Sequence, residues 1–483
     1  MCLSLEKRDK TANYSFEKRD EKANYSFRKR DELLTKNFIN VILTIGDTMK
    51  RKIYDQLLSW KNNEQNRKPL MVLGVRQSGK TYIIDEFCRQ EFANYIYINL
   101  FEQNDVCNLY NSDLTSDEKF AQLKILVNFD LDIPGTILFI DEIQESEKLI
   151  AELKYFCEKH NNVHIICAGS LLGVKLKRSR FSFPVGKVKM LNMYPMDFEE
   201  FLMAMKEDLL IKSIKDAYER NSKISDAIHE KALKLYRIYL ITGGMPESVQ
   251  NMVDAQKDYI KYDQSILKDI LESYFNDMNK YVTSDTEALK INRLYKSLPA
   301  QLANNSNKFQ YSKIDKNARA REYETSLDWL CASNMVIQAL AVKTPQIPLK
   351  GFVDPDTFKL YLSDVGILCN ILGLSMQDIL TDNISLYKGI IAENYVANQL
   401  ICKEYELYYW KSDALAEIDF LLYTKDGIIP VEVKIGDTAK SKSLNTYITK
   451  FHPPYAIRIN TKGFGYDKEK KIKSIPLYAT FCL

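Results

Sequence analysis

A glycine-containing motif directly after a short apolar run constrains this chain more than any other feature. The motif is Gly74-Val75-Arg76-Gln77-Ser78-Gly79-Lys80-Thr81, and it follows Leu70-Met71-Val72-Leu73. Glycines let a loop wrap closely, so its backbone N–H groups can point at phosphate oxygens, and a following helix adds its positive dipole end. An apolar strand before the motif and a helix from Thr81 to Gln90 after it are the context that a P-loop requires. We therefore predict a nucleotide phosphate site here.

The P-loop pattern also assigns a role to each residue. Lys80 is expected to reach the β- and γ-phosphates and to act in catalysis, and Thr81 is expected to ligate Mg²⁺. ATP and Mg²⁺ are the expected cofactors. The predicted nucleotide contacts are Gly74, Val75, Arg76, Gln77, Ser78, Gly79, Lys80, Thr81 and Tyr82.

A second apolar run ends in two acids, in Ile137-Leu138-Phe139-Ile140-Asp141-Glu142. Ligands bind at the carboxyl edge of parallel sheets, so Asp141 is expected to hold Mg²⁺ through water and Glu142 to polarise the attacking water. A helix N-cap could account for one of the acids. The pair behind an apolar strand is better explained as catalytic, and the glutamate favours hydrolysis.

Other candidates follow the next strand. Ser170, at the end of Val163 to Gly169, fits a γ-phosphate sensor and a plain helix N-cap equally well. A basic stretch then offers a charge-stabilising finger, although a solvated face is the more common explanation. Its members are Lys175, Lys177, Arg178, Arg180 and Lys187.

Apolar runs alternate with amphipathic helices from Lys68 to Ala168, in strands expected at 94–100, 136–140 and 163–168 and a helix at 145–160. This alternation predicts an α/β fold with a parallel sheet that is covered on both faces. Residues 190–275 are expected to be mostly helical, and 285–345 to form three helices and a β-ribbon around 336–342. A mixed α/β pattern follows to the C-terminus.

Composition limits the function less than these motifs do. The 67 basic and 64 acidic residues give a net charge of +3, so a basic surface for nucleic acid would have to be local. Nine cysteines and four histidines form no zinc spacing. No apolar run reaches the roughly 18 residues of a membrane span, so we expect a soluble, cytoplasmic protein without a membrane partner.

The N-terminus carries an 11-residue repeat, in which residues 6–16 recur at 17–27 and, in decayed form, at 28–38. Each unit offers too few apolar residues for a coiled-coil seam, so a charged, disordered extension is expected at 1–48. Because an amphipathic helix begins just after Met49, translation could also start there.

The C-terminal region contains a strand, a turn and a return strand around Glu417-Ile418-Asp419 and Glu432-Val433-Lys434. Glu432 and Lys434 face the same side of a strand, Asp419 could lie beside them, and Glu393 on a preceding helix could complete the set. This is the Asp…Glu-x-Lys arrangement of many metal-dependent nucleases, in which the acids bind Mg²⁺ and the lysine orients water. An exposed ion pair on a surface hairpin is the alternative.

Several motifs together resemble the prokaryotic AAA-type ATPases that carry a C-terminal domain of unknown function. The marks are the P-loop, Phe139 to Gln144, Ala168-Gly169-Ser170, residues 182–187, Tyr194-Pro195-Met196, Gly243-Gly244-Met245-Pro246 and Phe358 to Gly366. Many relatives have an arginine where this chain has Lys187, which puts an arginine finger there in doubt.

After the extension at 1–48, this resemblance implies an AAA-type P-loop core at 49–205, a helical lid at 206–280, a winged-helix-like region at 281–345 and a restriction-endonuclease-like domain at 346–483. It does not imply one biological role. The function that we expect is ATP hydrolysis coupled to a nuclease-like, DNA-interacting C-terminal domain. The rival is an ATP-dependent regulatory switch with an inactive nuclease-like domain. DNA is a candidate partner through the winged-helix and C-terminal regions, and a homo-oligomer is a candidate assembly.

Overall fold

The computed structural model describes residues 49–63, 67–178, 183–282, 284–302, 309–384, 387–412, 416–435 and 442–483. These residues belong to one compact unit, Lys50–Leu483, apart from Met49. The predicted extension at 1–48, with its repeat, lies outside the described residues.

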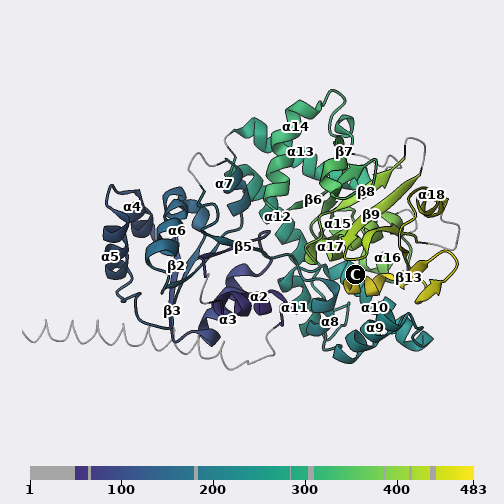
Figure 1. The fold of residues 1–483 in the computed structure, drawn as a ribbon, viewed down its shortest axis with the longest axis horizontal. Coiled ribbons are helices and arrows are strands. Elements are labelled where there is room, and N and C mark those ends of the chain that lie inside the picture. The colour runs from purple at the N-terminus through teal and green to yellow at the C-terminus, as the bar shows by residue number, and fades with distance from the viewer. Residues whose placement is uncertain are drawn as a thin grey trace, which may run out of the picture. The chain divides into compact units, whose positions relative to one another are not determined.

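A five-stranded parallel sheet carries the P-loop, with the strand order β2-β3-β4-β1-β5. Its strands are β1 (Leu70–Leu73), β2 (Asn94–Asn99), β3 (Thr136–Asp141), β4 (His164–Ala168) and β5 (Lys189–Asn192). Its helical elements are α2 (Ile53–Lys61), α3 (Lys80–Glu91), α4 (Asn104–Asn111), α5 (Ser116–Leu126), η1 (Ile143–Glu145), α6 (Glu147–Lys159) and α7 (Leu172–Arg178). The expected α/β fold with a parallel sheet is confirmed (Figure 1).

Continuous apolar strands are explained by burial on both faces of this sheet. In β1, Met71 and Leu73 contribute to a core with helices α4, α5 and α6, while Leu70 and Val72 contribute to a second core with α2 and α3. Successive side chains of a strand point to opposite faces, so both sets must be apolar. The central strands are therefore fixed in place from two sides.

A helical region follows the first sheet and leads into the second one (Figure 1). Its elements are α8 (Phe198–Ala204), α9 (Asp208–Arg220), α10 (Asp226–Thr242), α11 (Pro246–Asp254), α12 (Ser265–Lys280), α13 (Asp285–Leu302), η2 (Tyr311–Lys313) and α14 (Ala320–Ala332). Where three helices were expected at 285–345, the described residues hold α13 and α14 with the 3-10 turn η2 between them.

The second sheet is mixed and has eight strands in the order β12-β13-β11-β10-β9-β8-β6-β7. They are β6 (Val336–Val342), β7 (Val353–Leu362), β8 (Tyr408–Lys411), β9 (Glu417–Thr424), β10 (Gly427–Val433), β11 (Ala456–Asn460), β12 (Gly465–Asp467) and β13 (Ile472–Pro476). The accompanying helices are η3 (Leu349–Phe352), α15 (Val365–Ile371), α16 (Met376–Leu380), α17 (Lys388–Cys402), α18 (Lys442–Phe451) and η4 (Leu477–Cys482).

The ribbon expected around 336–342 is a strand of this second sheet. It is β6, which pairs antiparallel with β7 and parallel with β8. The expected domain limit at 345 therefore passes through one hydrogen-bonded sheet. In the part of the chain that the structure describes, no helix has the length and apolar character needed to cross a membrane.

Three motifs that are far apart in the sequence meet at the buried side chain of Asp364. Its carboxylate accepts hydrogen bonds from the backbone N–H of Gly244 at 2.6 Å and of Ile367 at 2.9 Å. Gly244 also accepts a hydrogen bond from the backbone N–H of Met196 at 2.7 Å. Burial raises the pKa of Asp364 to about 6, although these N–H groups oppose the shift. This junction joins the end of the P-loop core to the helical region and to the second sheet.

Close backbone approach at this junction requires a glycine at position 366. A Cβ there would lie 2.5 Å from the backbone nitrogen of Gly243. We predict that Gly366→Ala lowers the free energy of unfolding by about 1–3 kcal/mol or more, because the two segments must move apart. Urea denaturation measures the loss, and Gly389→Ala in α17, where a Cβ meets nothing within 4 Å, is the matched control. An equal effect of both substitutions would contradict the close-packed junction.

Candidate active site

The P-loop folds around the ammonium group of Lys80. This group donates hydrogen bonds to the backbone carbonyls of Gly74 at 2.9 Å and Val75 at 2.8 Å. Burial lowers the pKa of Lys80 to about 8, although the carboxylates of Glu142 and Asp141 act in the opposite direction. The lysine is thus held at the position where a P-loop binds phosphate oxygens, with two acids close enough to influence it.

Helix α3 begins directly under the loop because Gly79 adopts a left-handed conformation, with φ 88° and ψ 21°. The Arg51 guanidinium holds the P-loop in place. It donates to the carbonyl of Ser78 at 3.0 Å and to the carbonyl of Tyr194 at 2.8 Å, and it forms an ion pair with Glu200 at 3.1 Å. The start of α3, with its free N–H groups, is therefore held rigidly against the sheet.

The strand-end acid Asp141 meets the P-loop directly. The Thr81 hydroxyl donates to the Asp141 carboxylate at 2.8 Å, and the Tyr97 hydroxyl lies 3.3 Å from the same oxygen. Hydroxyl and carboxylate oxygens are the ligands that Mg²⁺ prefers, so this pair fits a magnesium triphosphate. The structure brings together the two predicted Mg²⁺ ligands, which are 60 residues apart in the sequence.

Glu142 follows in a strained backbone conformation, with φ 53° and ψ 41°. Its side chain accepts a hydrogen bond from the amide nitrogen of Gln144. The carbonyl oxygen of the same amide is buried without a partner in the described structure and lies over Gly169, where any side chain would collide with it. Gln144 therefore connects the predicted catalytic glutamate with the end of β4. Non-glycine residues with positive φ often mark functional positions.

The tip of the P-loop contacts the helical region through Arg76. Its guanidinium forms an ion pair with Asp277 on α12, and its carbonyl accepts a hydrogen bond from Tyr274 at 3.3 Å. The Asp277 side chain is 2% exposed, and its second oxygen has no partner in the described structure. Burial raises the pKa of Asp277, although Arg76 opposes the shift. A charged contact thus joins the loop to α12.

The remaining candidates of the first sheet lie around this centre. Ser170 follows β4, which lies between β3 and β1, so it is at the same edge of the sheet. Tyr82 is 59% exposed. Lys187 forms an ion pair with Glu158 at 2.9 Å, and Lys175 forms one with Glu147 at 3.3 Å. Both lysines are therefore paired with acids of α6 in their own chain.

The predicted nuclease-like residues occupy neighbouring positions in the second sheet. Asp419 on β9 accepts a hydrogen bond at 2.7 Å from the backbone N–H of Val433, which lies between Glu432 and Lys434. Glu432 is buried and one of its oxygens has no partner in the described structure, whereas Lys434 is exposed. Burial raises the pKa of Glu432, opposed by Lys434 and Arg458.

A lysine that the sequence analysis did not select lies among the acids. The Lys359 ammonium on β7 lies 2.8 Å from Glu393 and 2.6 Å from Glu417. Burial alone would lower the pKa of Lys359, but the surrounding carboxylates hold it well above its usual value. Burial and the charge of Glu393 raise the pKa of Asp419 well above its usual range. The cluster therefore consists of Glu393, Glu417, Asp419 and Lys359.

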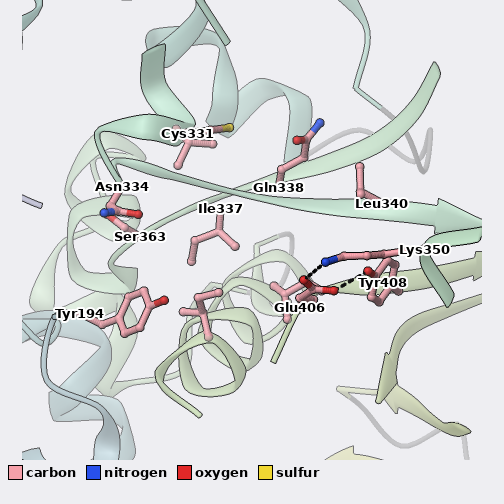
Figure 2. Close-up of a pocket in the computed structure, with 13 residues that line it drawn as sticks. Tyr194, Cys331, Asn334, Ile337, Gln338, Leu340, Lys350, Ser363, Glu406 and Tyr408 are labelled. Carbon is pink, nitrogen blue, oxygen red and sulfur yellow. Dashed lines mark hydrogen bonds and ion pairs between the residues drawn. The ribbon is translucent and has the colours of Figure 1, made fainter. Parts of the chain in front are cut away.

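A separate cavity of about 300 Å³ lies beneath β6 (Figure 2). Its wall is mostly apolar, with Tyr194 at one end and Glu406 at the other. Glu406 forms an ion pair with Lys350 and accepts a hydrogen bond from the Tyr408 hydroxyl at 2.7 Å. None of the predicted catalytic residues lines this cavity.

The sequence analysis did not select four residues that complete these sites, which are Arg51, Gln144, Asp277 and Lys359. Gln144 lies two residues after Glu142 in a motif that was noted, so its side chain could have been considered. The other three act across 27 or more positions, on elements whose pairing no local pattern reveals.

Three family models match parts of the chain. Residues 66–202 match the AAA domain. Residues 233–378 match a domain of unknown function, DUF8612, and residues 388–480 match another, DUF4143. Neither of the last two descriptions names a fold or activity, so the nuclease-like domain stays a prediction.

The similar proteins include a relative in sequence and several solved structures. An uncharacterized protein of Methanocaldococcus jannaschii is 24% identical over 438 residues, which cover 84% of this chain and 87% of the relative. The Walker-type ATPase of Pyrococcus abyssi has a TM-score of 0.40 and 15% identity, over 68% of this chain and 97% of that chain. The Aeropyrum pernix ORC2 protein has a TM-score of 0.30 and 11% identity, over 69% and 93%. The AAA-domain match and the geometry of the P-loop support an AAA-type P-loop ATPase.

Proposed function

We propose that this chain hydrolyses ATP with Mg²⁺ at the P-loop and couples its nucleotide state to a nuclease-like, DNA-interacting C-terminal domain. The hydrogen bond between Thr81 and Asp141 carries the first half of this proposal, because it joins the two residues that we propose as magnesium ligands, and the charge of Asp141 acts on Lys80. Mg²⁺, when bound, would neutralise charge on the phosphates.

Different residues of the site would bind the phosphates and activate the water. Loop N–H groups and the start of α3 bind the phosphates, and Lys80 leaves the carbonyls of Gly74 and Val75 to reach them. Glu142 orients the attacking water and accepts its proton. In the present arrangement the carboxylate of Glu142 is bonded to Gln144. Gln144 would thus set the direction in which Glu142 points.

The contact of Arg76 with Asp277 supports coupling to the rest of the chain. Bound phosphates would attract Arg76 away from a buried carboxylate, one oxygen of which has no partner among the described residues. Helix α12 packs against α13 and α15, and α15 begins at the Asp364 junction. A shift of α12 would therefore reach the second sheet through packed elements.

Two observations support a nuclease-like fold for the C-terminal region. Strands β8, β9 and β10 form an antiparallel meander, and β11 joins β10 in parallel after the helix α18. Helix α17, which carries Glu393, packs against β7 and β10. These elements carry the acids that we propose for the nuclease-like site, with Glu393 on the helix, Asp419 on a hairpin strand and Glu432 on its return strand.

The DNA contact proposed for 281–345 would be made with phosphates. Lys313, Lys316, Arg319 and Arg321 are exposed. The neighbouring aromatic Phe309 instead stacks on Phe358, with ring centroids 5.5 Å apart. A buried ring cannot stack on bases, so this surface offers charge for contacts with phosphates.

The rival function is an ATP-dependent switch whose nuclease-like domain does not cleave. The ion pairs of Lys359 with the acid cluster favour this rival, because an ammonium group already contacts one oxygen of Glu393 and one of Glu417. Incubation of assorted DNAs with Mg²⁺ or Mn²⁺, comparing the wild type with Asp419→Ala, separates the two functions. Cleavage that is lost in Asp419→Ala supports the first function, and no cleavage supports the switch.

Binding and turnover should separate in two P-loop variants. We predict that Lys80→Glu weakens nucleotide binding at least about 100-fold, because it replaces a charge-assisted contact by repulsion. Glu142→Gln should bind ATP normally and lose turnover by about 10²–10⁴-fold. Fluorescent-nucleotide titration and phosphate release measure the two effects. Glu145→Gln, an exposed acid nearby, is the control. Normal affinity in a folded Lys80→Glu sample would refute the site.

Gln144 should affect catalysis without affecting stability. We predict that Gln144→Met keeps the fold, because the methionine fills the same space and removes a buried oxygen that has no partner. Turnover should nevertheless fall about tenfold, since Glu142 loses the donor that orients it. Nucleotide affinity should stay constant. Unchanged turnover in this variant would show that the amide only fills space.

DNA should stimulate ATP turnover severalfold if the two halves are coupled as proposed. A DNA-binding titration at several salt concentrations tests the contact surface. The double variant Arg319→Ala with Arg321→Ala should lower the slope of log binding constant against log salt concentration by up to about 1.8, since each phosphate contact contributes about 0.9. Lys212→Ala with Lys223→Ala removes two exposed charges from another region and is the control. Equal slopes in both double variants would exclude the surface around Arg319 as the DNA contact.

A further inference from the structure

The acid cluster of the second sheet contains its own cation. Lys359 contacts Glu393 at 2.8 Å and Glu417 at 2.6 Å, and its side chain is only 11% exposed. The Tyr361 hydroxyl donates to the same oxygen of Glu393 at 2.5 Å. Lys359 also lies over the ring of Tyr409, 5.1 Å from its centroid. These contacts on several sides restrict the motion of the Lys359 ammonium group.

The position of Lys359 matters because a nuclease-like fold implies a divalent metal among these acids. Mg²⁺ requires oxygen ligands at about 2.0–2.1 Å in near-octahedral geometry. One oxygen of Glu393 and one of Glu417 instead contact the ammonium at longer distances, while the second oxygen of Glu417 and one oxygen of Glu432 are buried without a partner in the described structure. Among the described residues, no group of three or more His, Cys, Asp or Glu side chains is arranged to hold a metal ion. The residues therefore do not fit the implied metal.

Lys359 is also distinct from the lysine that the Glu-x-Lys pattern predicts. Lys434 follows β10 and is exposed, whereas Lys359 belongs to β7 at the far edge of the sheet. Lys359 contacts Glu393 and Glu417 directly, so these two acids already hold a cation that belongs to the chain.

We propose that Lys359 takes the place of a divalent cation in this cluster, so that the C-terminal domain binds neither Mg²⁺ nor Mn²⁺ there. The ammonium compensates part of the charge of Glu393 and Glu417, and entry of a metal between these two acids would require it to leave two ion pairs and an aromatic face. This inference does not depend on ATP hydrolysis, because it concerns only the second sheet. It sides with the rival function, in which the nuclease-like domain does not cleave.

Manganese binding to the full-length, nucleotide-free chain tests the proposal. Electron paramagnetic resonance counts the Mn²⁺ that stays free in solution. The wild type and Asp419→Asn should bind equal amounts, since any Mn²⁺ at Thr81 and Asp141 is common to both. Lys359→Met should gain one Mn²⁺ per chain, and the double variant Lys359→Met with Asp419→Asn should lose it again.

Lys343→Met is the matched control, because it removes an exposed lysine paired with Asp354 at 3.3 Å on the same sheet. It should gain no Mn²⁺. An additional Mn²⁺ in the wild type that disappears in Asp419→Asn overturns the proposal. A folded Lys359→Met chain that gains none overturns it as well. Where Lys359→Met does not fold, the comparison of wild type with Asp419→Asn decides alone. Measuring ATP turnover on the same samples distinguishes these outcomes from a failure of the P-loop assignment.

Discussion

Parallel pairing of β1, β3 and β4 is the constraint on which the candidate active site depends. Parallel strands end at the same edge of a sheet, so the P-loop after β1, the acids after β3 and Ser170 after β4 emerge side by side. The hydrogen bond of Thr81 to Asp141 shows how close two of these strand ends come. Burial of the strands on both faces prevents them from shifting, because a slip would move apolar side chains out of their cores.

Much of this half of the molecule could be predicted from sequence, because its signals are local. The apolar run at 70–73, the glycines of the P-loop and the run that ends at Asp141 each predict their own structure. Arg51 could not be predicted, since its partner Glu200 is 149 positions away and neither residue belongs to a pattern. The Asp364 junction explains why glycines are needed at 243, 244 and 366, which the sequence presents only as isolated motifs.

The second sheet was less predictable, for a physical reason. Spacing along one strand identifies Glu432 and Lys434 as neighbours, but it says nothing about which other strand lies beside them. Lys359 reaches the acids from β7, and β7 joins the sheet through β6, a strand that had been placed in a different region. The lysine that the pattern selected is exposed, and the one that contacts Glu393 and Glu417 comes from outside the pattern.

Buried charges are paired differently at the P-loop and in the acid cluster of the second sheet, and this difference affects how the two regions could work together. Around the P-loop, one oxygen of Asp277 has no partner among the described residues and Lys80 has a lowered pKa, so both are only partly compensated and a bound triphosphate would change their partners. Around Glu393, the ammonium of Lys359 already forms ion pairs with two acids, and one further oxygen of Glu417 has no partner among the described residues. A change of ion-pair partners is therefore favoured at the nucleotide site and opposed by the ion pairs of Lys359 in the second sheet. Under the proposed coupling, ion-pair partners would change at the nucleotide site, and α12, α15 and the Asp364 junction would transmit the movement. The C-terminal domain would then move as a rigid body, with its own acid cluster unchanged.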